Sequence, residues 1–213
     1  MSLPFDAAAA LRQISSNSQT RDAWARCAAH RQRIQELIVA ASGERGGRIC
    51  VLGAGNCNDV DLRALADRFT EIHLADIDRE ALEAAVGRQH LPDAARIVLH
   101  APCDLSGILA GGECADDVLH RIRAHSLELD GPYDLVLSAG LLTQMYQSAE
   151  DLDFAEPATL DLVLELRRQH LRLLFDLVRP GGAFILVTDV VSTASAPDLR
   201  TCAAERLESR LAE

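Results

Sequence analysis

Five short apolar runs, separated by segments long enough to hold helices, limit most strongly what this chain can fold into. A short continuous apolar run is typical of a strand that is buried on both faces. Strands that alternate with helices predict βαβ units and a mostly parallel sheet, because strands in the same direction need a crossover connection. The five runs are residues 49–52, 72–75, 97–99, 133–137 and 183–187.

Helical spacing of apolar residues fills the segments between these runs. It predicts helices at 60–69, 79–88, 116–127 and 160–178, the last of which stops at the turn Arg179-Pro180-Gly181-Gly182. Before the first strand, residues 6–41 predict two helices with a polar break at 15–18, and the second helix ends at Ser42-Gly43. We therefore divide the chain into a helical lead-in or lid, 1–47, and a sheet domain, 48–213.

Charge and composition exclude several classes of function. The net charge of −11 is spread along the chain and disfavours a nucleic acid partner, because a phosphate backbone would be repelled. All 21 basic residues are Arg, which excludes a Lys Schiff base and a P-loop Lys. The six cysteines form no C-x-x-C pair, and the histidines lack ligand spacing, so we expect no disulfide framework and no metal.

The same composition indicates in which cellular compartment the protein is expected. Unpaired cysteines suit a reducing compartment, and neither a basic and apolar leader nor a membrane-spanning run is present in the sequence. We expect a cytoplasmic protein without membrane contact.

Glycines at the end of the first predicted strand mark a candidate binding turn. In Gly53-Ala54-Gly55 the missing side chains let a ligand approach the backbone, and the helix that follows offers free N–H groups. The dinucleotide fingerprint G-x-G-x-x-G would require glycine where Asn58 stands. A tight turn without a ligand is the alternative.

Acidic residues follow the next two strands. Asp76 ends the second strand about twenty residues after the glycine turn, where a carboxylate accepts hydrogen bonds from ribose hydroxyls. For Asp78, a helix N-cap is the favoured role. After the third strand, Asp104 offers an acceptor for the amine of adenine and Leu105 a surface for its ring, with a turn-capping Asp as the alternative.

Taken together, these motifs resemble the class I S-adenosylmethionine-dependent methyltransferase family over residues 48–191. The similarity rests on five stretches: VLGAGNCNDVDL, HLADID, HAPCDLSG, YDLVLSAGLLTQM and LLFDLVRPGGAFILVTDVV. The resemblance implies an α/β, doubly wound sheet of about five strands in the order 3-2-1-4-5.

The family usually adds a C-terminal β-hairpin, but residues 192–213 predict only a polar turn and an amphipathic helix. We therefore expect either a sheet that stops at five strands or a truncated chain, whose fifth strand would be an exposed edge and a basis for aggregation or a homodimer.

The resemblance also assigns a cofactor and its site. S-adenosyl-L-methionine would be bound and S-adenosyl-L-homocysteine released. The implied contacts are the methionine part with Gly53, Ala54, Gly55 and Asn56, the ribose with Asp76 and Ile77, the adenine with Asp104 and Leu105, and the sulfonium with Ser138 and Ala139. The family commonly has glycine where Cys57 stands and an acidic residue where Val51 stands.

A methyltransferase acting on a small molecule or a protein side chain is therefore the leading hypothesis. Methyl transfer mainly requires alignment and exclusion of water, so a catalytic base is optional. The candidates for such a base lie after the fourth strand, in the segment expected to face the methyl acceptor: Gln144, Tyr146 and Asp151. Two rivals stay open: a noncatalytic cofactor-binding or scaffold protein, and an NAD(P)-dependent oxidoreductase, which should contain a Tyr-x-x-x-Lys pair or a further domain.

Overall fold

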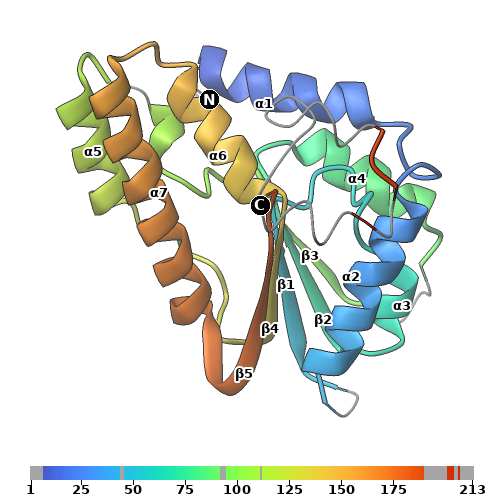
Figure 1. Cartoon of the computed structure of the whole chain (residues 1–213). Helices are drawn as coiled ribbons and strands as arrows, with labels where there is room; N and C mark the ends of the chain where they lie inside the picture. The colour runs from blue at the N-terminus through green and yellow to red at the C-terminus, as the bar shows by residue number, and fades with distance from the viewer. Residues whose placement is uncertain are drawn as a thin grey trace.

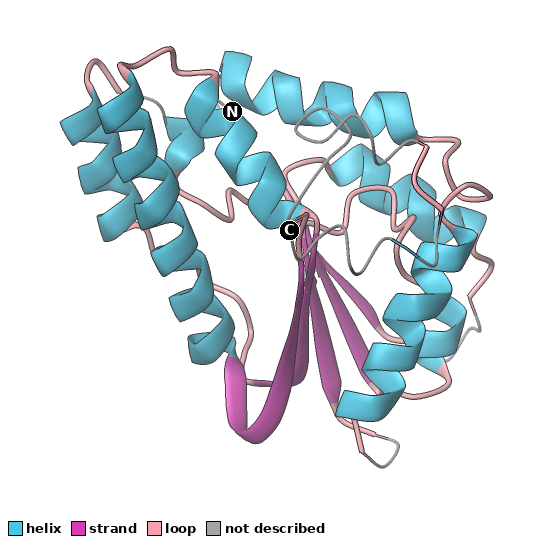
Figure 2. Ribbon diagram, viewed as in Figure 1, coloured by secondary structure: helices cyan, strands magenta, loops and turns pink. Residues whose placement is uncertain are grey.

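A single parallel sheet forms the centre of the molecule. The computed structural model describes residues 7–43, 46–91, 95–110, 112–189, 201–203 and 206. The sheet has five strands in the order β3-β2-β1-β4-β5, and all four neighbouring pairs are parallel (Figures 1 and 2). The predicted fold class and strand order are confirmed. The strands are β1 (Arg48–Leu52), β2 (Glu71–Ala75), β3 (Ile97–His100), β4 (Tyr133–Ala139) and β5 (Val178–Val187).

Helices cover both faces of this sheet, as expected for a doubly wound fold. In Figure 1, α2, α3 and α4 lie on one face and α5, α6 and α7 on the other, while α1 crosses above the carboxyl ends of the strands. The helices are α1 (Ala7–Thr20), α2 (Ala28–Ala41), α3 (Leu62–Ala66), α4 (Arg79–Arg88), α5 (Ala115–Ala124), α6 (Leu141–Glu150) and α7 (Glu156–Leu177), with a 3-10 turn η1 (Ile108–Ala110).

Alternating strand residues feed two separate cores. Because successive side chains of a strand point to opposite faces, Ile49 and Val51 pack under α2, α3 and α4, while Cys50 and Leu52 pack under α5, α6 and α7. Both faces of β1 are therefore buried, which explains its unbroken apolar sequence. Among the described residues, no helix combines the length and apolar character needed to cross a membrane.

The predicted break at residues 15–18 is wrong. Helix α1 runs through this polar stretch, and the break falls at 21–27 instead. The hydroxyl groups of Ser16, Ser18 and Thr20 donate to the carbonyl oxygens four residues earlier, at 3.4, 3.2 and 3.0 Å. Bonds of this kind let short polar side chains remain inside a helix.

Two further elements differ from the sequence prediction. Helix α6 was not predicted, and it begins directly after Gly140, whose backbone φ is +71°. The turn at 179–182 is part of β5, where the pairing with β4 jumps from Tyr133↔Val178 to Leu135↔Ala183. The predicted turn is thus a bulge that bends the strand. The predicted C-terminal helix falls almost entirely outside the described residues.

Candidate active site

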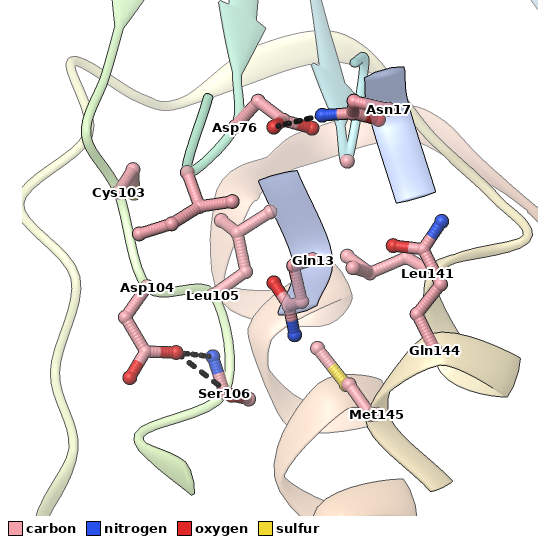
Figure 3. A pocket seen from close by; sticks show the side chains of 12 residues that line it. Gln13, Asn17, Asp76, Cys103, Asp104, Leu105, Ser106, Leu141, Gln144 and Met145 are labelled. Carbon is pink, nitrogen blue, oxygen red and sulfur yellow. Dashed lines mark hydrogen bonds between the residues drawn. The ribbon is translucent and has the colours of Figure 1, made fainter. Parts of the chain in front are cut away.

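A hollow lies at the carboxyl ends of β1 and β2, beside the point where the strand order reverses. In open α/β sheets this crevice is the usual place for a ligand. The hollow has about 20 Å³ of free volume in this conformation, room for about one water molecule, so a larger ligand would enter only if residues of its lining move. Figure 3 shows its lining: Gln13 and Asn17 from α1, Gly53, Asp76 and Ile77 from the strand ends, Cys103 to Ser106 after β3, and Leu141, Gln144 and Met145 from α6.

The glycine turn forms one wall of the hollow. Gly53 and Gly55 have φ values of +68° and +43°, a region that glycine enters without steric cost. A Cβ on Gly53 would lie 3.1 Å from the side chain of Leu141, so α6 can pack closely only against glycine here. Cys57, where the family commonly has glycine, also has a positive φ of +50°. Its side chain is fully buried in the core under α2, α3 and α4, which compensates for the strained backbone.

Asp76 links this turn to the end of β2. Its Oδ2 accepts a hydrogen bond from the backbone N–H of Gly55 at 2.8 Å, and its Oδ1 accepts one from the N–H of Asp78 at 2.9 Å. Burial raises the pKa of Asp76, and these hydrogen bonds lower it in part. The carboxylate is thus fixed at the crevice, with its rotamer set by the backbone around it. Asp78 is the N-cap of α4, as predicted, because its Oδ1 accepts from the N–H of Ala81 at 3.0 Å.

Helix α1 covers the carboxylate from above. The side-chain amide of Asn17 donates to Asp76 Oδ1 and to Asp78 Oδ2, both at 3.3 Å (Figure 3 shows the first). Asn17 is also so close to the glycine turn that a Cβ on Gly55 would lie 2.7 Å from its Oδ1. A side chain of the lead-in therefore occupies the space where a ribose bound to Asp76 would place its hydroxyls.

The two asparagines of the glycine turn hold α1 in this position. Asn56 Nδ2 donates to the carbonyl of Asn17 at 2.6 Å, and Asn58 Nδ2 donates to the carbonyl of Thr20 at 2.8 Å. Arg88 from α4 donates to the carbonyl of Asn56 at 2.6 Å. The side chain of Asn56, a predicted cofactor contact, thus reaches the lead-in helix in this structure.

Asp104 and Leu105 lie in the loop after β3. Asp104 Oδ1 accepts from Ser106 N at 2.8 Å, Ser106 Oγ at 2.7 Å and Gly107 N at 2.9 Å, so Asp104 caps a turn. This is the alternative role weighed for it from the sequence. Oδ2 accepts only from Leu109 N, at 3.2 Å, among the bonds of the described residues, and Asp104 still lines the hollow. Leu105 is 6% exposed and lines the hollow beside it.

Ser138 and Ala139, at the end of β4, are buried, and among the described residues neither belongs to the lining of the hollow. Ser138 Oγ lies 2.9 Å from His170 Nε2 on α7, and both side chains are buried. Burial lowers the pKa of His170 to about 4, so this imidazole is neutral at pH 7. In the described conformation the Ser138 side chain faces the core and not the hollow.

The acceptor-side candidates take different positions. Gln144 lines the hollow from α6, whereas Tyr146 packs against the core between α6 and α7, where burial raises its pKa. Asp151 pairs with Arg12 on the surface at 3.2 Å. Among the lining residues, sequence reasoning missed Gln13, Asn17, Cys103, Ser106, Leu141 and Met145. The spacing of four between Gln13 and Asn17, and between Leu141 and Met145, is a signal that could have placed each pair on one helix face.

Nucleophilic cysteine chemistry is disfavoured around the hollow. Burial raises the pKa of the Cys57 and Cys103 thiols to about 12. Both thiols therefore stay protonated at neutral pH, and the protonated thiol is a poor nucleophile.

Comparison with known proteins finds likeness in structure only. No protein-family model and no curated protein matches the chain. Solved structures similar to it include the 1,6-didemethyltoxoflavin-N1-methyltransferase of Burkholderia thailandensis (20% identity, TM-score 0.49), the glycopeptide N-methyltransferase MtfA (16%, 0.45) and the N-methyltransferase NodS of Bradyrhizobium japonicum (11%, 0.39). These matches cover 87%, 73% and 73% of this chain.

The chain spans only 64%, 52% and 60% of those three structures. Two of them were solved with S-adenosylhomocysteine. The fold itself rests on the observed strand order and not on these likenesses. Five parallel strands in the order 3-2-1-4-5, with helices on both faces, give the chain a Rossmann-like fold.

Proposed function

We propose that the chain binds S-adenosyl-L-methionine in the hollow and transfers a methyl group from it to a small molecule or a protein side chain. The position of Asp76 carries this proposal. Its carboxylate lies at the end of β2, bonded to the N–H of Gly55 in the neighbouring turn. A carboxylate held between a glycine turn and a strand end is suited to accept hydrogen bonds from the two hydroxyls of a ribose.

The lining fits the rest of the cofactor. Gly53 lines the hollow and would lie beside the methionine part once Asn17 moves away, and Ile77 and Leu105 offer apolar walls. Asp104 has an acceptor oxygen that can take the amine of adenine. The cofactor supplies an activated methyl group on a sulfonium. The chain has to hold it, align the acceptor and exclude water.

The α6 side of the hollow is mainly apolar, with Leu141 and Met145 beside Gln144. Gln144 is the candidate for contact with the acceptor, because it lines the hollow from α6. Tyr146 packs against the core and does not line the hollow. The net charge of −11 favours a small molecule or a protein side chain over a nucleic acid.

Calorimetry on the whole chain tests the proposal. We expect S-adenosylmethionine and S-adenosylhomocysteine to bind and NAD not to bind. Tight binding of NAD would support the oxidoreductase alternative, and no binding of any of the three would contradict a cofactor site here.

A noncatalytic scaffold protein is the second candidate, and the contact of α1 with Asp76 favours it. If α1 stays closed, Asn17 keeps the ribose position beside Asp76 filled, and neither a cofactor nor an acceptor would enter. In that case the lead-in, residues 1–47, would stay closed over the site and would not open for a ligand.

Asn17→Ala tests whether Asn17 competes with the cofactor for Asp76 or contacts the cofactor. The substitution removes both side-chain hydrogen bonds to Asp76 and Asp78. Each such bond contributes about 0.5–1.5 kcal/mol, so S-adenosylmethionine should bind about 10-fold more tightly once the competing amide is gone. Gln19→Ala, at an exposed position of the same helix, is the matched control and should change nothing. A weaker affinity in Asn17→Ala would instead make Asn17 a ligand contact.

A further inference from the structure

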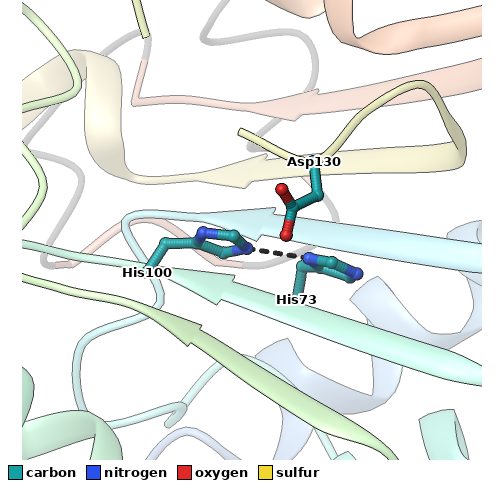
Figure 4. A group of neighbouring side chains, drawn as sticks. All are labelled: His73, His100 and Asp130. Atoms are coloured by element: carbon teal, nitrogen blue, oxygen red, sulfur yellow. Dashed lines mark hydrogen bonds between the residues drawn. The ribbon is translucent and has the colours of Figure 1, made fainter. Parts of the chain in front are cut away.

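Two histidines and an aspartate from three separate segments converge on the face of the sheet that carries α5, α6 and α7. His73 is in the middle of β2, His100 ends β3, and Asp130 lies in the loop that leads into β4 (Figure 4). His73 Nδ1 and His100 Nε2 are 2.8 Å apart. One ligand atom from each of the three residues lies within 4.8 Å of the other two.

The register of the sheet explains why these histidines meet. His73 pairs with Val98 and Ala75 pairs with His100, so the two histidines lie two positions apart on adjacent strands and share one face. Their rings stack with centroids 5.1 Å apart and an angle of 14° between the planes. A separation of 27 residues in the sequence hides this contact.

A second layer of polar groups surrounds His73. Glu71 Oε1 lies 3.3 Å from His73 Nε2, on the side of the ring away from His100. A carboxylate behind a histidine is the usual arrangement in metal sites, because it can hold the proton on the far nitrogen. In this conformation the Arg48 guanidinium, which can only donate, also lies 3.1 Å from His73 Nε2. Binding of an ion at Nδ1 therefore requires Arg48 to release Nε2 so that the proton can move there. Arg48 and Arg96 each pair with Glu71 at 3.0 Å, which fixes its side chain, and the Tyr133 hydroxyl lies 3.3 Å from His73 Nδ1.

We propose that His73, His100 and Asp130 form a binding site for a divalent transition-metal ion of the zinc type. Two imidazole nitrogens and one carboxylate oxygen are ligands that Zn²⁺ takes in tetrahedral sites. Mg²⁺ and Ca²⁺ prefer oxygen ligands and would find only one carboxylate here. Zn–N distances of about 2.0–2.1 Å place two ligand nitrogens about 3.3 Å apart, so the rings need to separate by roughly half an ångström.

The exposure of the three residues indicates how an ion would enter. His73 is buried, His100 is half-buried and Asp130 is exposed, so the site opens to solvent on the Asp130 side. Burial lowers the pKa of both imidazoles. The fourth position is left to water or to another ligand. A bound ion would tie the loop before β4 to β2 and β3.

Titration of the untagged, chelator-treated chain with Co²⁺ and Zn²⁺ tests this site. We expect one equivalent of Co²⁺ to give the visible absorption bands of a tetrahedral site, and Zn²⁺ to displace it. Asp130→Asn and His100→Gln should weaken Zn²⁺ binding at least 10-fold, and Glu71→Gln by about 10- to 100-fold, as for other residues behind a metal ligand. His120→Gln, an exposed histidine on α5, is the matched control and should bind as the unaltered chain does.

Asp130 is exposed, so its variant should fold even if changes at the buried His73 do not. The proposal is wrong if no tetrahedral bands arise, or if Asp130→Asn and His100→Gln bind Zn²⁺ as tightly as the control.

Discussion

Replacing Asp76 with alanine is expected to weaken the binding of S-adenosylmethionine by about 10- to 150-fold. Hydrogen bonds to a charged group contribute about 1.5–3 kcal/mol each, and a ribose held by this carboxylate would lose its main polar partner. The loss should fall on affinity, because Asp76 lies beneath the ribose position and not beside the acceptor. Calorimetry with S-adenosylhomocysteine gives the same comparison without turnover.

Two controls separate binding from folding. Asp76 also accepts from the backbone of Gly55 and Asp78, so thermal unfolding of Asp76→Ala has to be measured beside its affinity. Asp76→Asn keeps the shape and two of the acceptor sites, and should lose less affinity than alanine. Asp161→Ala, an exposed acidic position on α7, changes the net charge equally and should bind normally. Unchanged affinity in a folded Asp76→Ala variant would remove the ribose assignment and the proposal that rests on it.

The sheet could be predicted because its signal is local. Each strand contains a short, mostly apolar run, which is mostly buried in β1, β2 and β4 and half-buried in the edge strands β3 and β5. Helix α6 was not predicted because only Gly140 separates it from β4. The apolar residues Leu141 and Leu142 therefore resemble a continuation of the strand sequence. The break between α1 and α2 was misplaced because Ser16 and Ser18 satisfy their hydroxyls inside the helix, which sequence pattern alone does not reveal.

The site was predictable only in part, and for a different reason. Asp76 and the glycine turn are adjacent in any parallel sheet of this order, since β1 and β2 are neighbours. The contacts of Asn17 with Asp76 and of Ser138 with His170 depend on how helices dock. Contacts of this kind, between residues far apart in the chain, do not appear as a periodic pattern in the sequence. The pair His73 and His100 is an intermediate case, because it follows from strand register once the order β3-β2-β1 is known.

Ile38→Ala is expected to lower the free energy of unfolding by about 2–5 kcal/mol, the usual cost of truncating a large buried aliphatic side chain. Ile38 is 0% exposed and packs with Ile34 against Ile49 and the other strand residues beneath α2. Urea unfolding measures the loss, and Val39→Ala, at a position of the same helix that is 48% exposed, is the matched control, expected to change it by less than about 0.5 kcal/mol.

The loss of unfolding free energy in Ile38→Ala indicates which helices can move when the site opens. A large effect would mean that α2 is part of the sheet's core, so that only α1, joined to it by residues 21–27, is free to leave Asp76 when a ligand enters. The Asn17→Ala variant should then gain affinity without losing the cooperativity of unfolding. A loss as small as that of Val39→Ala would contradict this, because α1 and α2 could then move together and the whole lead-in, residues 1–47, would act as the lid.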